Sequence, residues 1–170
     1  ATDTTGVGTA RFALAAAGYG GDKAIFGYGS AAGPTNTAVT NLVSNTGTVA
    51  TDTTGVGTAR RELAAAGYGG DKAIFGYGST SSSGSTTFRT AITNLVSNTG
   101  VVATDTTGVG TARKMLAAAG YGGDKAIFGY GLSTTYVSMT NKVSNTGVVA
   151  TDTTGVGIVR YALAAAGYGG

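Results

Sequence analysis

The chain contains nearly the same sequence four times. The block ATDTTGVG begins at Ala1, Ala50, Ala103 and Ala150, and each copy continues through an arginine and two variable residues into LAAAGYGG. Three copies then continue as DKAIFGYG, a segment that differs each time, and TN(L/K)VSNTG. A unit of about fifty residues that recurs along a chain is typical of repeat architectures, in which each copy folds as one supersecondary unit.

The differences between the copies gather at two places. Their aspartates Asp3, Asp52, Asp105 and Asp152 are 49, 53 and 47 residues apart, and this variation falls in three segments of 11, 15 and 9 residues: Ser30–Thr40, Ser79–Thr93 and Leu132–Thr140. Substitutions also gather in the pair after the arginine: Phe12-Ala13, Arg61-Glu62, Lys114-Met115 and Tyr161-Ala162. A constant scaffold with divergent loops predicts a binding surface, and neutral drift in exposed loops is the alternative.

Composition excludes several classes of protein. The chain is 42% hydrophobic with a single proline, which argues against disorder despite its 31 glycines. A net charge of +3, spread over the copies, lacks the basic stripe of a nucleic-acid-binding protein. There is no cysteine, no apolar run near eighteen residues and no signal peptide, so we expect neither disulfides nor membrane insertion. Both ends cut into a repeat, which suggests a fragment of a longer array.

Strand patterns dominate each copy. Residues alternate with a period of two along DKAIFGYG, and Asn45-Thr46-Gly47 has the composition of a turn. The pattern predicts four strands per copy, in the first copy Ala10–Tyr19, Lys23–Tyr28, Thr40–Asn45 and Thr48–Thr53. One alternative stays open. Residues 58–69 could form a two-turn helix that begins at Thr58 and ends at Gly67, which would give a β-β-α repeat array.

The run Arg-x-x-Leu-Ala-Ala-Ala-Gly-Tyr-Gly-Gly-Asp-Lys-Ala-Ile-Phe-Gly-Tyr-Gly, followed by a loop and Asn-Leu-Val-Ser-Asn-Thr-Gly, resembles a blade of the kelch family. The resemblance implies an all-β fold, a portion of a β-propeller with four-stranded blades. The chain departs from the family's pattern because its glycine pair is interrupted as Gly27-Tyr28-Gly29 and the usual tryptophan of the fourth strand is absent. The array is also similar to repeat proteins of marine tailed bacteriophages, which implies a role in a virion or in host contact.

A propeller would place both variable regions on one face, because the loop between the second and third strands and the connection to the next blade open on the same side. We therefore predict a ligand-binding surface there, and exposed aromatic residues in varied loops suit sugar rings or protein pockets. The candidate residues are Phe12, Ala13, Arg61, Glu62, Phe88, Arg89, Lys114, Met115, Tyr136 and Tyr161.

Catalysis is not expected. The chain has no histidine and no cysteine, which removes most nucleophile–base pairs and most zinc or copper sites, so no cofactor or metal is predicted. Aspartate and arginine recur with a constant spacing of eight, as in Asp52 and Arg60, and we expect a repeated ion pair or an arginine-to-backbone bond that fixes blade registry. The alternative is an anion-binding ring near a central channel formed by Arg11, Arg60, Arg113 and Arg160.

The sequence thus predicts a non-enzymatic recognition module of a virion or the extracellular space that binds a host-surface glycan or protein. The alternative is a structural repeat protein of a virion or filament, in which the loops only drift. Other virion proteins or further copies of the chain are expected as partners that close the ring.

Overall fold

The structure, a computed structural model, describes residues 5–33, 35–82 and 85–167. Nine strands form three antiparallel sheets, each with its strands in chain order. The first sheet contains β1 (Ala15–Tyr19), β2 (Lys23–Gly27) and β3 (Thr40–Val43); the second β4 (Ala64–Tyr68), β5 (Lys72–Gly76) and β6 (Thr93–Val96); the third β7 (Ala117–Tyr121), β8 (Lys125–Gly129) and β9 (Thr140–Val143). The all-β prediction is confirmed.

The helix alternative is wrong, because the alanine run of residues 64–68 forms strand β4. Within the described residues the only helical element is the short 3₁₀ helix η1 (Thr86–Phe88), which lies in a variable segment. A strand is favoured over a two-turn helix because the alanines pair with the next strand: Ala64 lies opposite Gly76 and Tyr68 lies opposite Lys72. So short a helix is marginal in water without strong packing.

The predicted fourth strand is wrong as well, since each sheet has three strands. Residues 48–53 run beside β3 but form only two isolated bridges with it, Val43 with Val49 and Thr40 with Thr53. Between these bridges the chain advances three positions on β3 and four on the other segment, so one extra residue interrupts the ladder as a bulge. The Asn41 side chain fills the interruption by donating to the Ala50 carbonyl at 3.1 Å.

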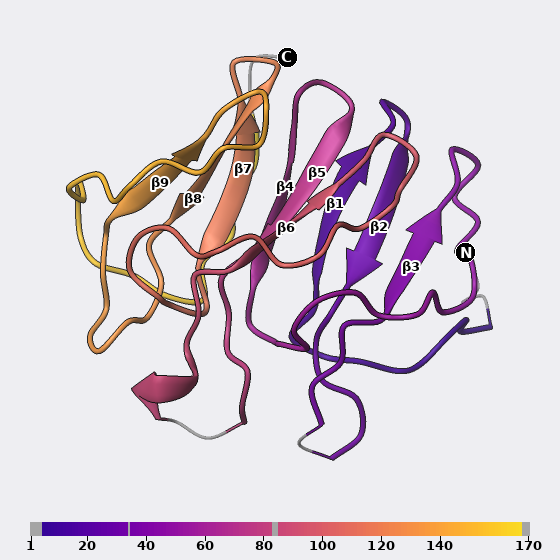
Figure 1. The fold of residues 1–170 in the computed structure, drawn as a ribbon, viewed down its shortest axis with the longest axis horizontal. Coiled ribbons are helices and arrows are strands. Elements are labelled where there is room, and N and C mark those ends of the chain that lie inside the picture. Colours follow the sequence, from indigo (N-terminus) through magenta and orange to yellow (C-terminus); the bar gives the residue numbers. More distant parts are fainter. Residues whose placement is uncertain (1–4, 34, 83–84, 168–170) are drawn as a thin grey trace.

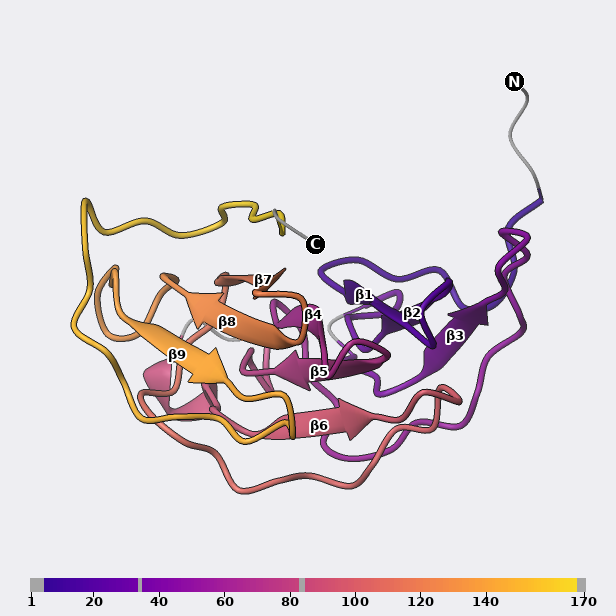
Figure 2. The ribbon, with the colours of Figure 1, turned by 90° about the horizontal axis from the view of Figure 1, so that it is seen from above.

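The three sheets stand side by side in an open arc, with β1, β4 and β7 on its inner side (Figures 1 and 2). The inner strands approach closely because glycines lie where they meet: a Cβ on Gly67 would lie 3.5 Å from the Gly18 carbonyl oxygen, and one on Gly120 would lie 3.5 Å from that of Gly67. The described residues do not close a ring, so the structure supports an all-β repeat array and no closed propeller.

Aromatic rings on one face of each sheet hold the array together. Phe75 of β5 packs on Gly27 at the end of β2, where an added Cβ would lie 2.7 Å from the phenylalanine Cζ. The same ring meets Tyr28 edge-on, with centroids 5.1 Å apart, and both side chains are fully buried. Phe128 repeats the arrangement on Gly76 and Tyr77. The core therefore lies between neighbouring sheets.

Candidate functional site

The variable residues gather at one end of the sheets, at the lower side of Figure 1. In the second sheet, backbone bridges place Arg61 beside Ser79 and Ser79 beside Arg89, so the variable pair and both ends of the variable segment form one row. The corresponding rows are Phe12–Ser30–Asn36 in the first sheet and Lys114–Leu132–Tyr136 in the third. We call this part of the molecule, residues 12–13, 30–33, 35–40, 61–62, 79–82, 85–93, 114–115, 132–140 and 161–162, the variable end.

A backbone ladder supports the variable end across the sheets. The Glu62 N–H donates to the Ala13 carbonyl at 2.9 Å, the Met115 N–H to the Glu62 carbonyl at 2.8 Å, and the Ala162 N–H to the Met115 carbonyl at 2.8 Å. These four residues have φ between 51° and 57°, the left-handed region. Because the bonds involve only the backbone, side chains here can differ without loss of the ladder, although β-branched residues are disfavoured at positive φ.

Side chains of neighbouring copies meet in pairs at this end. The Arg61 guanidinium lies 6.0 Å from the Phe12 ring centroid, and the Lys114 amine lies 2.7 Å from a Glu62 carboxylate oxygen. Tyr161 stacks on Tyr136 with centroids 4.5 Å apart and an interplanar angle of 5°. The structure thus brings variable residues of adjacent copies together, which the sequence spacing alone did not indicate.

The predicted binding residues differ in exposure. Phe12, Phe88, Tyr136 and Tyr161 expose 55%, 41%, 48% and 44% of their surface, as a contact role requires. Lys114 is buried at 8% exposure, so its amine serves the ion pair with Glu62. The remaining candidates are half-buried: Ala13, Arg61, Glu62, Arg89 and Met115.

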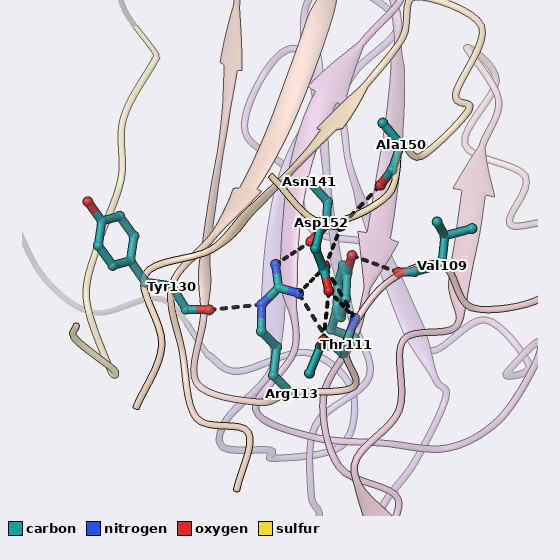
Figure 3. Close-up of polar contacts among 8 residues, drawn as sticks. Val109, Thr111, Arg113, Tyr130, Asn141, Ala150 and Asp152 are labelled. Carbon is teal, nitrogen blue, oxygen red and sulfur yellow. Dashed lines mark hydrogen bonds and ion pairs between the residues drawn. The ribbon is translucent and has the colours of Figure 1, made fainter. Parts of the chain in front are cut away.

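A second set of polar contacts recurs in the three sheets, although no hydrogen bond joins Arg60 to Asn94 in the second, and it is drawn for the third sheet in Figure 3. Arg113 donates through Nε to the Tyr130 carbonyl at 2.9 Å and through Nη2 to Asn141 Oδ1 at 2.7 Å. Asn141 in turn donates to Asp152 Oδ1 at 2.9 Å, and the Thr111 hydroxyl donates to Asp152 Oδ2 at 2.7 Å. These residues tie together the segment before the inner strand, the third strand and the chain that follows it.

The arginine-to-backbone bond predicted from the sequence is present, but the carboxylate partner is another one. Arg113 Nη1 lies 3.9 Å from Asp152 Oδ1, and this aspartate belongs to the following copy. Burial lowers the pKa of Arg60, and the carboxylate that acts against this shift, Asp105, likewise belongs to the following copy. Asp52 and Arg60 therefore belong to different sheets. Asp52 accepts from Thr9 and Asn41 beside the first sheet. Arg60, eight residues further along the chain, donates to the Tyr77 carbonyl of the second sheet.

A ring of arginines around an open channel would need exposed guanidinium groups, and the side chains of Arg60 and Arg113 are fully buried. Each guanidinium also lies 4.3 Å from the ring centroid of a tyrosine in the preceding sheet, Tyr28 and Tyr77 respectively. Arg11 is half-buried and donates within its own sheet, and Arg160 is exposed and lies 4.7 Å from the Tyr130 ring centroid. The geometry favours the registry role.

Burial and hydrogen bonding shift the pKa values of the aspartates in opposite directions. Burial by itself would raise the pKa of Asp105, but hydrogen bonds from Thr58 and Asn94 outweigh it, so the pKa of Asp105 is lowered. The pKa of Asp152 is lowered in the same way by Thr111 and Asn141. Burial lowers the pKa of Arg113, from a value so high that the group stays charged near neutral pH. The network is therefore ionised and intact under ordinary conditions.

Sequence reasoning missed the threonine and asparagine of this network. A usable signal was present, because GTAR and TN(L/K)V recur unchanged at Thr9, Thr58 and Thr111 and at Asn41, Asn94 and Asn141, far from any turn that would explain them. A tyrosine that recurs in every complete copy also packs between sheets. The Tyr77 ring is buried against Phe128, and its hydroxyl donates to the Val109 carbonyl at 3.1 Å.

The end of the array opposite the variable end contains a cleft of about 450 Å³, lined by glycines and by Tyr68, Lys72, Tyr121 and Lys125 of the inner hairpins. Its lining is identical between copies, and Lys72 is paired with Asp71 at 2.9 Å and Lys125 with Asp124 at 2.7 Å. Across the described ranges, no three acidic, histidine or cysteine side chains are grouped so as to hold a metal ion. No helix in the described part of the chain is long and apolar enough to cross a membrane.

A scan against protein-family models found no match to this chain, and a search of curated proteins found none either.

Proposed function

We propose that the chain is a non-enzymatic recognition module, built as part of a kelch-like propeller, that binds a host-surface glycan or protein through its variable end. One observation carries this proposal: every position at which the copies differ in length lies at the end of the sheets where the variable pairs lie. Drift in exposed loops would also alter the exposed GYGGDK and SNTG turns at the other end, and these are constant between copies.

The side chains at the variable end support contact with a ligand. Its four exposed aromatic residues offer flat apolar surface, of the kind that sugar rings and protein pockets contact. The backbone ladder runs through Ala13 and Ala162, next to Phe12 and Tyr161, and so limits the entropy that these two residues lose on binding. The setting on a bacteriophage virion rests on the sequence similarity alone.

Exchange of one variable segment tests the proposal. Replacement of Ser79–Thr93 by the sequence of Leu132–Thr140 is expected to weaken binding to host cells, or to any glycan that an array identifies, by at least about tenfold, or 1.4 kcal/mol. The segment ends pair with the same β-bridge positions in both sheets, so the scaffold should tolerate the exchange. Unchanged affinity for every ligand of the unaltered chain would remove the support for a binding end.

Thr48→Val provides the matched control. Thr48 is exposed after the SNTG turn, at the other end of the sheet, and the other copies have Val101 and Val148 at this position. This substitution introduces a residue that the array already accepts, and it should leave binding unchanged.

A second candidate function is assembly, in which sheets of separate chains continue the array. The observation that favours it is Phe26, whose ring is 38% exposed, whereas its counterparts Phe75 and Phe128 are fully buried against a preceding sheet. Leu14, Phe26 and Val49 line an open hollow of about 550 Å³ beside the first sheet. A further copy of the chain that packs here would cover the Phe26 ring as the first sheet covers Phe75.

Assembly predicts concentration-dependent association. Light scattering coupled to size-exclusion chromatography is expected to show a mass that rises with protein concentration, and Phe26→Ser should return the chain to a monomer because it removes the exposed ring. Val101→Ser removes an apolar side chain that is 66% exposed outside this hollow, and it should leave the association unchanged. A monomer at every concentration of the unaltered chain would contradict this second function.

A further inference from the structure

Most charges of the array are paired within it. Lysines at the hairpin turns pair with the preceding aspartate, Lys114 pairs with Glu62, and buried arginines bind the carbonyl and asparagine groups described above. In the described residues no carboxylate lies within ion-pair distance of Arg61 or Arg89. The same holds for Arg11, Arg60, Arg160 and Lys142, but those four residues lie outside the variable end. Arg61 and Arg89 both lie at the variable end of the second sheet, so part of the chain's net positive charge is concentrated there.

The two arginines belong to one row of backbone-paired positions. Arg61 pairs with Ser79, and Ser79 pairs with Arg89. Residues directly opposite each other in antiparallel pairs project from the same side, and two strand spacings amount to about 10 Å. Ser79 between them is 1% exposed and has a small side chain. Two long side chains are thus positioned to approach a single group above the serine.

Several nitrogens of these guanidinium groups lack acceptors. Arg89 Nε, Arg89 Nη1 and Arg61 Nε are shielded from solvent, and none of them has a hydrogen-bond partner among the described residues. The Arg61 side chain donates from Nη2 to the Ser82 carbonyl at 3.0 Å. A shielded charged donor without an acceptor is costly, more so than a neutral one. An anionic ligand would supply the acceptors once the two guanidinium groups turn outward to meet it.

The surroundings suit a sugar that carries the anion. Asn36, from the first sheet, donates to the Ser79 carbonyl at 3.1 Å, and its shielded Oδ1 has no donor among the described residues, so it can accept from a hydroxyl group. Phe12, next to Arg61, and Phe88, next to Arg89 in sequence, expose 55% and 41% of their surface and offer rings on which a sugar face can pack.

We infer that Arg61 and Arg89 bind a carboxylate or sulfate group of an acidic saccharide, with Asn36 as hydroxyl acceptor and Phe12 as a stacking surface. The inference rests on the proposed function, because it requires the variable end to be a binding surface. It adds the ligand class and locates the site at the boundary of the first and second sheets. No covalent step is involved.

Binding of defined polymers tests the inference. Isothermal titration of the full chain with polygalacturonate, dextran sulfate and neutral dextran should show binding to one or both acidic polymers and none to dextran. Arg61→Gln and Arg89→Gln should each weaken that binding about tenfold or more, as expected for loss of a charge-assisted hydrogen bond. Lys142→Gln, which removes the same charge from an exposed position of β9, should change it little.

The two acidic polymers distinguish carboxylate from sulfate as the group recognised. Absence of binding to both, or equal losses for Lys142→Gln and the arginine variants, would overturn the inference. Equal affinity for polyglutamate would overturn the saccharide assignment. If the loop exchange alters host-cell binding while the arginine variants bind normally, this inference fails and the proposed function stands.

A measurement on the unaltered chain covers the case in which an arginine variant does not fold. A polymer that binds only the folded chain raises its thermal unfolding midpoint. We expect polygalacturonate or dextran sulfate to raise the midpoint and dextran at equal mass concentration to leave it unchanged. Equal midpoints with all three polymers would count against the site.

Discussion

Phe75→Ala is expected to lower the free energy of unfolding by about 3–5 kcal/mol, the range for a buried phenylalanine in a packed core. Phe75 is fully buried, covers Gly27 and meets Tyr28 edge-on. Its removal leaves a cavity between the first and second sheets that the strand backbones cannot close. Urea unfolding followed by circular dichroism at 25 °C gives the comparison with the unaltered chain.

Phe26→Ala is the matched control, because Phe26 occupies the same position of the repeat and is 38% exposed. Phe26→Ala should therefore lower the free energy of unfolding by clearly less than Phe75→Ala, when both are measured at a protein concentration at which the chain is monomeric. The slope of the free energy against urea concentration should stay similar if both variants unfold as one unit. Equal losses at the two positions would mean that the phenylalanines do not stabilise the chain by packing between sheets.

Arg113→Met should be the second most damaging substitution, with an expected loss of about 3–5 kcal/mol, as when one partner of a buried charge network is removed. It deletes the hydrogen bonds to the Tyr130 carbonyl and to Asn141, and it leaves Asn141 Oδ1 without its donor. The guanidinium also covers the Tyr77 ring of the preceding sheet, so the boundary between the second and third sheets loses a contact. The same urea experiment measures the loss.

Two variants make this result specific. Arg160→Met changes the equivalent residue of the fourth copy, which is exposed, and it should cost far less. Arg113→Lys keeps the charge but loses the planar fork that reaches a carbonyl and an asparagine together, so it should remain destabilising. Full stability of Arg113→Lys would show that charge alone matters and would contradict the network described here.

Much of the fold could be predicted from local sequence patterns. The period-two alternation in DKAIFGYG predicted β2, β5 and β8 to within one residue, because neighbouring side chains of a strand project to opposite faces. Consecutive glycines of the hairpin, such as Gly20 and Gly21 with φ of 62° and 81°, marked the turn between the first two strands. The clustering of variable residues at one end followed from counting strand directions.

The remaining features depend on contacts that local patterns do not encode. The segment around Val49 is β-branched and looks like a strand, but the bulge is set by the Asn41 side chain, which bonds the Ala50 carbonyl. The aspartate beside Arg60 comes from the next copy, 45 positions along the chain, and the equivalent separations differ because a variable segment intervenes. A fixed spacing of eight therefore suggested the wrong pair.

The unmet donors of Arg61 and Arg89 were also beyond sequence reasoning. Both residues were candidates because they are variable, yet only the pairing of residues 61, 79 and 89 shows that they share one row. Burial of individual nitrogens depends on how neighbouring loops fold over them. Composition alone gave a small, dispersed net charge.

The constancy of the contacts between sheets has a genetic consequence. The same contact joins each pair of neighbouring sheets, Phe75 on Gly27 and Phe128 on Gly76, and every complete copy encodes the residues that make it. Unequal crossing-over between the repeated gene segments would delete, duplicate or reorder copies, and each new pair of neighbouring sheets would keep this packing contact. Recombination would then produce new combinations of variable segments without changing the residues that hold the sheets together.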